Sequence, residues 1–143
     1  MNARAKELVS GMVMDVVCAV LMDRQGHVLI CKRAEGMSHA GLWEFPGGKV
    51  EAGESDSVAL IREISEELAC VVEVGDGLST VVHKYPDFTI RLKPYRCRLC
   101  DAEVQPQALE HAELAWVDVA QLGAYDLAPA DQPIATELQS EER

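Results

Sequence analysis

The chain has 143 residues and a formal net charge of −11, with a sequence pI near 4.7. This length suits one domain that can bury a core without help from disulfides. The acidic balance argues against a broad surface for nucleic-acid polymers, because such surfaces neutralise phosphates with Lys and Arg. No apolar run reaches membrane-spanning length. An acidic protein that handles phosphates needs a metal ion and a few placed cations.

The composition also bears on the cellular compartment. Residues 1–11 contain no long apolar segment, so we expect no signal peptide. Five cysteines, an odd number, then indicate reduced thiols in the cytoplasm. Cys97 and Cys100 lie three apart in a strand-like run and should face opposite sides. We interpret this pair as structural, not as a zinc or redox motif.

The first third of the chain has the pattern of strands and turns. Residues 13–21 are rich in Val and predict a strand, followed by a turn at residues 23–26. Residues 27–33 predict its hairpin partner. Residues 34–42 contain Gly and Ser and predict a loop.

After a central stretch at residues 43–70, the pattern predicts further strands and two helices. A strand should lie within residues 71–83, with a break at the glycines of residues 75–77. The remaining predicted elements are a turn at 85–87, a strand at 88–98, a short strand at 113–119, a small helix at 120–123, a loop at 124–133 and a terminal helix at 134–142. This order predicts one mixed α/β (α+β) domain over residues 1–143, with a mixed sheet packed between helices.

The central stretch ends in a helix that is rich in carboxylates. At ~100° per residue, Glu63, Glu66 and Glu67 fall within about 100° of one another, and the apolar residues point the other way. Like charges four residues apart repel, and a hard cation such as Mg²⁺ would turn that repulsion into ligation by oxygen. The acidic face therefore predicts a metal site. The alternative is a solvated helix face, since Glu is a good helix former.

A glycine-rich turn precedes this helix. Gly47 and Gly48 let the backbone come close to a ligand, and a bare carbonyl from such a turn can join carboxylates around a cation. The alternative is an ordinary tight turn. Ser55 and Ser57 are both suitable caps for the start of the helix.

The spacing of Gly48, Glu54 and the run Arg62-Glu63-Ile64-Ser65-Glu66-Glu67 resembles the Nudix box, the signature of the Nudix hydrolase family, here at residues 48–70. The resemblance implies the Nudix fold, with a loop–helix–loop box. It also implies that the Gly48 carbonyl, Glu63, Glu66 and Glu67 hold Mg²⁺ or Mn²⁺, and that Glu54 pairs with Arg62 to brace loop against helix. Two positions depart from the family pattern. Ala69 stands where the family has Gly, the favoured residue at a helix end, and Cys70 fills the final apolar slot.

Positions outside the box resemble the MutT-like branch of the family. Arg33 ends a strand where that branch places a substrate-contacting Arg; the alternative is an exposed strand-end Arg. Glu110, six residues before Trp116, resembles a further metal-binding or base-like Glu, with His111 and Glu113 as competitors for that place. Tyr85 can stack on a base or anchor a turn.

Asp131 lies in a segment that resembles the Pro-Ala-Asn-x-Pro motif of MutT-like enzymes, with Asp in place of Asn. An ionised Asp only accepts hydrogen bonds, which suits the amino group of cytosine. The pattern Pro-Ala-Asp-x-Pro resembles the CTP pyrophosphohydrolase branch. The alternative is that Asp131 caps the terminal helix.

The resemblance implies a Mg²⁺-dependent pyrophosphohydrolase that converts a nucleoside triphosphate to the monophosphate and pyrophosphate. We expect (d)CTP or modified (d)NTPs as substrate, with Glu63, Glu66, Glu67 and Glu110 catalytic. One of Glu63, Glu66 and Glu110 would take the proton of the attacking water. The alternatives are oxidised dGTP or ADP-ribose as substrate, or a sensing domain without turnover. The expected partner is a small nucleotide, with the chain as monomer or homodimer.

Overall fold

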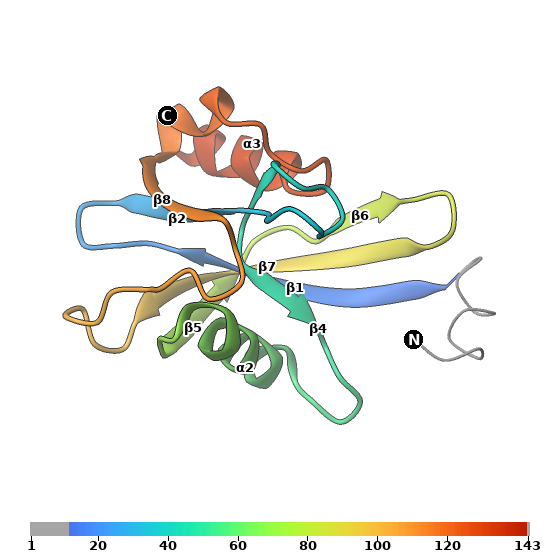
Figure 1. Cartoon of the computed structure of the whole chain (residues 1–143), viewed down its shortest axis with the longest axis horizontal. Coiled ribbons are helices and arrows are strands. Elements are labelled where there is room, and N and C mark those ends of the chain that lie inside the picture. Colours follow the sequence, from blue (N-terminus) through green and yellow to red (C-terminus); the bar gives the residue numbers. More distant parts are fainter. Residues whose placement is uncertain (1–11, 143) are drawn as a thin grey trace.

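The computed structural model describes residues 12–142, so the expected absence of a signal peptide at residues 1–11 lies outside the described residues. Two β-sheets lie between two helices, with α2 (Asp56–Leu68) on one side and α3 (Gln132–Glu141) on the other (Figure 1). This arrangement agrees with the predicted mixed α/β class. Within residues 12–142, no helix is long and apolar enough to span a membrane.

The larger sheet has five strands and contains the parallel pair that makes it mixed. Its strands are β1 (Val13–Leu21), β4 (Gly47–Lys49), β5 (Val72–Gly77), β6 (Val81–Lys84) and β7 (Thr89–Leu99). Strands β1 and β7 run parallel over the full length of β1, and the other pairs are antiparallel. This places β1 in the sheet interior, between β4 and β7.

The smaller sheet corrects the predicted hairpin. It is antiparallel and consists of β2 (His27–Lys32) between β3 (Trp43–Glu44) and β8 (Glu113–Asp118). A single bridge, Met22 with Val28, joins β1 to β2 before they enter different sheets. Strand β1 otherwise pairs with β4 and β7, and β2 pairs with β3 and β8, so the two strands share no ladder beyond this bridge. The short strands β3 and β4 were not predicted.

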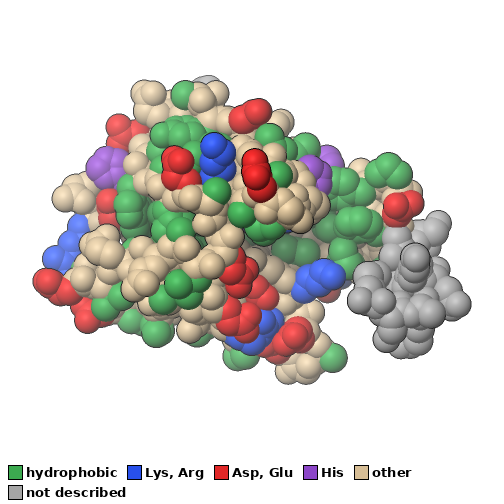
Figure 2. Space-filling view, in the orientation of Figure 1, with side chains coloured by type: hydrophobic (Ala, Val, Ile, Leu, Met, Phe, Trp, Pro, Cys, Tyr) green, Lys and Arg blue, Asp and Glu red, His purple; other side chains and the backbone are tan. Residues whose placement is uncertain are grey.

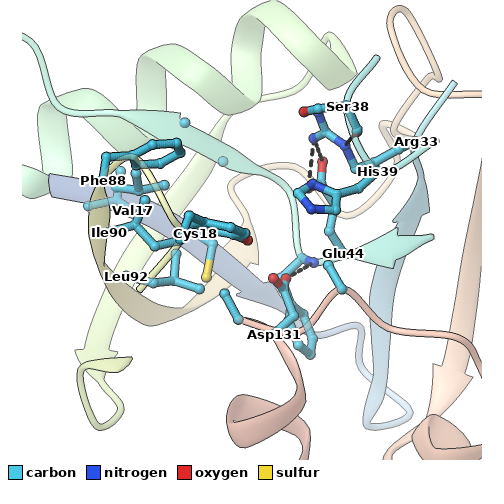
Figure 3. Close-up of a pocket in the computed structure, with 17 residues that line it drawn as sticks. Val17, Cys18, Arg33, Ser38, His39, Glu44, Phe88, Ile90, Leu92 and Asp131 are labelled. Atoms are coloured by element: carbon cyan, nitrogen blue, oxygen red, sulfur yellow. Dashed lines mark hydrogen bonds and ion pairs between the residues drawn. The ribbon is translucent and has the colours of Figure 1, made fainter. Parts of the chain in front are cut away.

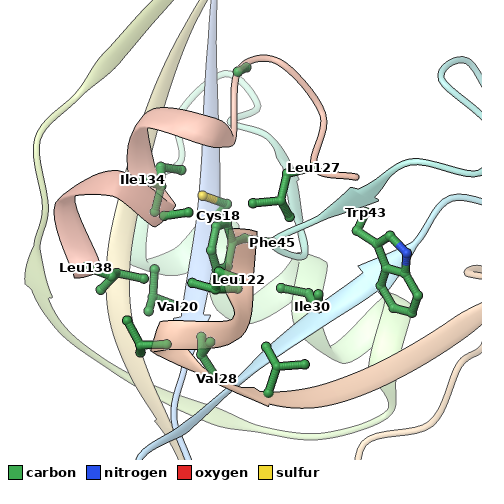
Figure 4. Close-up of a cluster of buried hydrophobic side chains, with 14 of the residues drawn as sticks. Cys18, Val20, Val28, Ile30, Trp43, Phe45, Leu122, Leu127, Ile134 and Leu138 are labelled. Carbon is green, nitrogen blue, oxygen red and sulfur yellow. The ribbon is translucent and has the colours of Figure 1, made fainter. Parts of the chain in front are cut away.

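Strand β1 is apolar throughout its second half because it contributes to two hydrophobic clusters. Val17, Ala19 and Leu21 pack with the apolar face of α2. Cys18 and Val20 point to the opposite side, toward β2, the 3₁₀ helix η1 (Val119–Ala124) and α3 (Figure 4). Successive side chains of a strand face opposite sides, so a strand buried on both faces has a continuous apolar run.

The ends of the helices follow local chemistry. Ser55 caps α2, because its Oγ accepts the Val58 N–H at 3.2 Å. The helix ends at Ala69, which has φ 54° and ψ 38°, a left-handed conformation in which glycine is favoured. Helix α3 begins two residues before its predicted start, with Pro133 in its first turn, where the missing N–H costs nothing.

Two further predictions concern glycines and cysteines. The break predicted at residues 75–77 is wrong, because these residues belong to β5 and the chain leaves the strand at residues 78–80. The glycines instead accompany a register shift between Val74 and Gly77. Cys97 is buried and Cys100 is exposed, and the five cysteines are free thiols.

Candidate active site

The glycine-rich turn packs tightly against the chain around it. A side chain at Gly47 would place a Cβ 2.0 Å from the Val17 carbonyl oxygen. At Gly48, a Cβ would lie 2.3 Å from the carboxylate carbon of Glu63. Both distances are far inside van der Waals contact. Gly47 meets backbone atoms and therefore requires glycine, whereas a side chain at Gly48 would displace the Glu63 carboxylate. The turn therefore brings the Gly48 backbone directly against a carboxylate of α2.

The three carboxylates of α2 differ in burial. The side chain of Glu66 is 53% exposed, that of Glu63 is 18% exposed and that of Glu67 is 7% exposed. Burial raises the pKa of Glu67 far above its usual range, and the neighbouring Glu63 raises it further. Two carboxyl groups thus meet in a partly desolvated site, an arrangement that a positive ion would stabilise.

Arg62 joins the loop before α2 to the helix. Its guanidinium donates to both oxygens of Glu54, at 2.7 and 2.9 Å, and to the Lys49 carbonyl at 3.1 Å. It also donates to Glu63 at 3.0 Å. Hydrogen bonds from Arg62, with a further one from the Glu51 backbone, lower the pKa of Glu54 to about 2. The structure therefore places Glu54 and Arg62 as a bidentate pair.

The donor atoms around the turn fit a hard divalent cation. The Gly48 carbonyl and the carboxylates of α2 offer only oxygen, which Mg²⁺ and Mn²⁺ prefer. Over residues 12–142, no three His, Cys, Asp or Glu side chains already surround one point as a metal site. Two of the three carboxylates, Glu63 and Glu66, instead contact Arg62, at 3.0 and 3.3 Å. Acidic side chains gather with basic ones beside β4 and α2 (Figure 2).

The loop between β7 and β8 closes over the end of α2. The N–H of Gln107 donates to the Leu68 carbonyl at 2.8 Å, and the N–H of Leu109 donates to the Glu67 carbonyl at 3.2 Å. These bonds satisfy carbonyls that the helix leaves free at its end. The loop thereby brings the exposed Glu110 close enough to Glu67 to raise the pKa of that carboxyl further.

A cavity of about 270 Å³ adjoins the glycine-rich turn. Three candidate substrate-binding residues, Arg33, Tyr85 and Asp131, all line it, and Gly48 forms part of the same wall (Figure 3). Apolar side chains of β1 and β7 also line it, among them Cys18, Ile90 and Leu92, together with the polar side chains of Ser38, His39 and Glu44. The structure therefore brings the candidate substrate residues and the box together at one cavity.

Asp131 belongs to the wall of this cavity. Its Oδ2 accepts the Phe45 N–H at 2.8 Å, and the side chain is buried. Although it occupies the position before α3, its side chain makes no capping hydrogen bond, so the alternative of a helix cap is wrong. Burial raises the pKa of Asp131 to about 7, although the bond from Phe45 opposes this effect.

Arg33 is not the free strand-end cation of the alternative interpretation. Its guanidinium contacts both oxygens of Glu44, at 2.9 and 3.0 Å, and the Ser38 carbonyl at 2.5 Å. Glu44 also accepts from the ring of His111, across 2.9 Å. Sequence reasoning missed Glu44; the available signal was one carboxylate in an otherwise apolar run before the glycine-rich turn.

Tyr85 anchors a turn, which is one of its two predicted alternatives, and it also lines the cavity. Its N–H donates to the Phe88 carbonyl at 2.7 Å, which closes the turn between β6 and β7. Its ring stacks on Phe88 at 5.1 Å and meets the rings of His83 and His39 at 4.7 and 5.7 Å. The tyrosine is thus an aromatic wall of the cavity as well as a turn anchor.

The relatives of this chain are named pyrophosphohydrolase and diphosphatase, and the chain is a hydrolase that acts on phosphoanhydride bonds of nucleotides. A family model described as the NUDIX domain matches residues 17–137, and the chain belongs to this Nudix hydrolase family. The predicted family and fold class are therefore confirmed. Nudix hydrolases generally use divalent metal ions.

Three relatives illustrate the similarity. The chain is 37% identical to a CTP pyrophosphohydrolase of Escherichia coli K12 over 123 residues, which are 86% of this chain and 90% of the relative. It is 39% identical to a putative 8-oxo-dGTP diphosphatase 2 of Mycobacterium tuberculosis, over 85% of each chain. Among solved structures, it is similar to the E. coli ORF135 protein, with a TM-score of 0.79, 34% identity and 92% of each chain covered.

Proposed function

We propose that the protein is a Mg²⁺-dependent nucleoside triphosphate pyrophosphohydrolase that acts on (d)CTP or modified (d)NTPs. One observation carries this proposal: the cavity lined by Arg33, Tyr85 and Asp131 reaches Gly48 of the box. A nucleotide with its base in the cavity would therefore have its phosphates beside the carboxylates of α2. The E. coli relative named CTP pyrophosphohydrolase supports the same class of substrate.

The residues of the box have separate tasks in this proposal. The Gly48 carbonyl with Glu63, Glu66 and Glu67 would hold a divalent cation, which when bound offsets negative charge on the phosphate oxygens and acidifies the attacking water. Arg62 keeps the turn and the helix at a fixed distance through its bidentate pair with Glu54.

The reaction itself needs one proton acceptor. The water oxygen forms a bond to phosphorus, the bond between the α-phosphate and β-phosphate groups breaks, and the monophosphate and pyrophosphate leave. The proton of the water goes to a carboxylate oxygen of Glu63, Glu66 or Glu110. Glu110 is suited to this role, because it is exposed and its loop is fixed to the end of α2.

Base recognition would fall to the buried end of the cavity. Oδ2 of Asp131 is engaged by the Phe45 N–H, which leaves Oδ1 to accept from the exocyclic amino group of cytosine. The ring of Tyr85 lies on the cavity wall, where it can stack on a base. A site built to bind one polar group rejects analogues that lack it.

Oxidised guanine nucleotide is a second candidate substrate. Burial raises the pKa of Asp131 to about 7, so a protonated fraction at neutral pH would donate to a carbonyl oxygen such as that of guanine. The M. tuberculosis relative is named a putative 8-oxo-dGTP diphosphatase. The proposal therefore includes modified (d)NTPs beside (d)CTP.

Product analysis across a panel of nucleotides tests the proposal. The panel is CTP, dCTP, ATP, dGTP, 8-oxo-dGTP and ADP-ribose, each with Mg²⁺ and with excess chelator. We expect monophosphate and pyrophosphate in equal amounts, the highest kcat/KM for (d)CTP or 8-oxo-dGTP, and no turnover with chelator. Binding without turnover would indicate a sensing domain, and preferred cleavage of ADP-ribose would overturn the proposed substrate class.

A further inference from the structure

We propose that His111 is a positioning residue that fixes Glu67 of the acidic helix relative to Glu44 of the cavity wall. The proposal rests on the proposed function, since it assigns Glu67 to metal binding and the cavity to the nucleotide. His111 does not line the cavity, and the sequence named it only as a competitor for the place of Glu110.

The histidine occupies a buried place between the two parts of the site. Its side chain is 1% exposed, and it directly follows Glu110 in the loop over the end of α2. The next residue, Ala112, donates its N–H to the Lys32 carbonyl at 2.8 Å, which ties the loop to β2. Backbone hydrogen bonds before and after His111 in the sequence therefore fix the position of its imidazole.

One ring nitrogen contacts both carboxylates. Nε2 lies 2.9 Å from Oε2 of Glu44 and 3.9 Å from Oε1 of Glu67. Arg33 contacts Glu44 from the other side. The side chains of Arg33, Glu44, His111 and Glu67 thus form a continuous line from the cavity to the acidic helix.

The position of the ring proton follows from these contacts. Both oxygens of Glu44 accept from Arg33, so this carboxylate is an acceptor and the proton of its bond to His111 lies on Nε2. The other ring nitrogen, Nδ1, is buried and has no hydrogen-bond partner among the described residues.

An unpaired buried nitrogen argues against a purely structural role. Such an atom costs free energy, and an apolar side chain of similar volume, such as Leu, would fill the space without that cost. What His111 supplies and Leu cannot is the Nε2–H that donates to Glu44, on the nitrogen that also lies 3.9 Å from Oε1 of Glu67. Residues behind metal ligands orient those ligands, and their removal typically costs about 10–100-fold in metal affinity or activity.

The test compares two variants of His111 with a matched histidine elsewhere. His111→Leu keeps most of the volume and removes the donor, whereas His111→Gln keeps an N–H near the place of Nε2. The control is His27→Leu, because His27 also lies between two carboxylates, Asp23 at 3.1 Å and Asp118 at 3.0 Å, but does not line the cavity.

Four quantities are measured for each variant: the Mn²⁺ dissociation constant without nucleotide, kcat, KM for the best substrate and Tm. We expect His111→Leu to raise the Mn²⁺ dissociation constant and lower kcat by about 10–100-fold, with little change in KM or Tm. His111→Gln should recover most of both losses, and His27→Leu should show neither. Unchanged Mn²⁺ affinity and kcat in His111→Leu, or losses of equal size in the Gln variant, would overturn the proposal.

The wild-type protein provides a measurement that does not depend on variants folding. ¹⁵N chemical shifts of the imidazoles report which nitrogen carries the proton. We expect His111 to be protonated on Nε2, and its shifts to change on addition of Mg²⁺ while those of His27 do not. A proton on Nδ1, or ¹⁵N chemical shifts of His111 that do not change on addition of Mg²⁺, would contradict the positioning role.

Failure of this role can be told apart from failure of the proposed function. If wild type cleaves no nucleotide of the panel but the Mn²⁺ affinity falls in His111→Leu, only the proposed function is wrong. If wild type cleaves a nucleoside triphosphate and His111→Leu behaves like wild type, only the positioning role is wrong.

Discussion

Two carboxylates of the same box, Glu54 and Glu67, have opposite surroundings. Glu54 accepts hydrogen bonds from Nε and Nη2 of Arg62, which lower its pKa to about 2. Glu67 is buried beside Glu63, which raises its pKa. The pairing with Arg62 stabilises the ionised form of Glu54 without any further group. The ionised form of Glu67 is unfavourable without a cation. Within about a dozen residues the chain thus separates a carboxylate that supports the fold from one suited to chemistry.

The largest expected effect is that of Glu67→Gln on turnover. Loss of the Glu67 carboxyl, a proposed cation ligand, should reduce kcat by about 10²-fold or more. The Tm should change little, because without the cation this buried carboxyl is protonated at pH 7 and Gln replaces it with another neutral group. Glu66→Gln should lower kcat similarly. Rate assays with Mg²⁺, paired with thermal melts, check both, and full turnover in excess chelator would contradict the role of the cation.

Asp131→Asn should change substrate preference while leaving the acidic helix alone. Asn can donate as well as accept, so the ratio of kcat/KM for 8-oxo-dGTP to that for dCTP should rise by about 10-fold or more. The measurement is kcat/KM for both nucleotides in wild type and variant. An unchanged ratio would remove Asp131 from base recognition.

The pH dependence of stability provides a second test of Asp131, again with the Asp131→Asn variant. The folded pKa of Asp131, about 7, lies above the ordinary value of 3.8. A group of this kind stabilises the folded state below pH 3.8, and that contribution is lost as the pH rises to 7, on the order of 4 kcal/mol at most. Urea unfolding of wild type between pH 5 and 8 should show this fall, and Asp131→Asn should show less of it.

Glu54→Gln should have the reverse profile to Glu67→Gln. We expect a lower Tm at pH 7, because the bidentate pair with Arg62 loses its charge, and a smaller loss of kcat than in Glu67→Gln. The stabilising contribution of Glu54 is present above its unfolded pKa, near 4.5, and is lost as the pH falls toward 2. If Glu54→Gln kept its Tm but lost turnover, Glu54 would be catalytic, and the contrast with Glu67 would not hold.

The smallest expected effect concerns the end of the same helix. Ala69 has φ 54°, a conformation that costs a residue with a Cβ about 1–2 kcal/mol and costs Gly almost nothing. Ala69→Gly should therefore raise the free energy of unfolding by about 1 kcal/mol without changing kcat. Urea unfolding and the standard rate assay measure both, and a fall in stability would show that the helix end tolerates Ala fully.

The sequence predicted the long elements because their patterns are local. The apolar run of β1, the alternation in β7 and the amphipathic α2 each identify one element. The pairing of β1 with β2 was predicted wrongly, because a run buried on both faces does not specify its neighbours. Strands β3 and β4 have two and three residues, too few for any period.

The same distinction between local patterns and long-range contacts applies to the site. The box and the segment around Asp131 carry recognisable spacings, and the structure gathers them at one cavity. Glu44 has no such spacing, because its partner His111 is 67 positions away and the contact exists only in the folded chain. His111 itself was identified only as a competitor for the place of Glu110. Contacts of this range follow from the packing of β2, β3 and β8, which the sequence did not predict.

Strand β1 is shared by the two hydrophobic clusters of the molecule. Val17 belongs to the cluster under the acidic helix, while its neighbour Cys18 belongs to the cluster under α3 and also lines the nucleotide cavity. The two clusters pack on opposite faces of β1. If one cluster lost its packing, the strand that supports the other cluster would lose the contacts on one of its faces. The acidic helix and the cavity beside it are therefore expected to open and close as one cooperative unit, rather than as two independently stable halves.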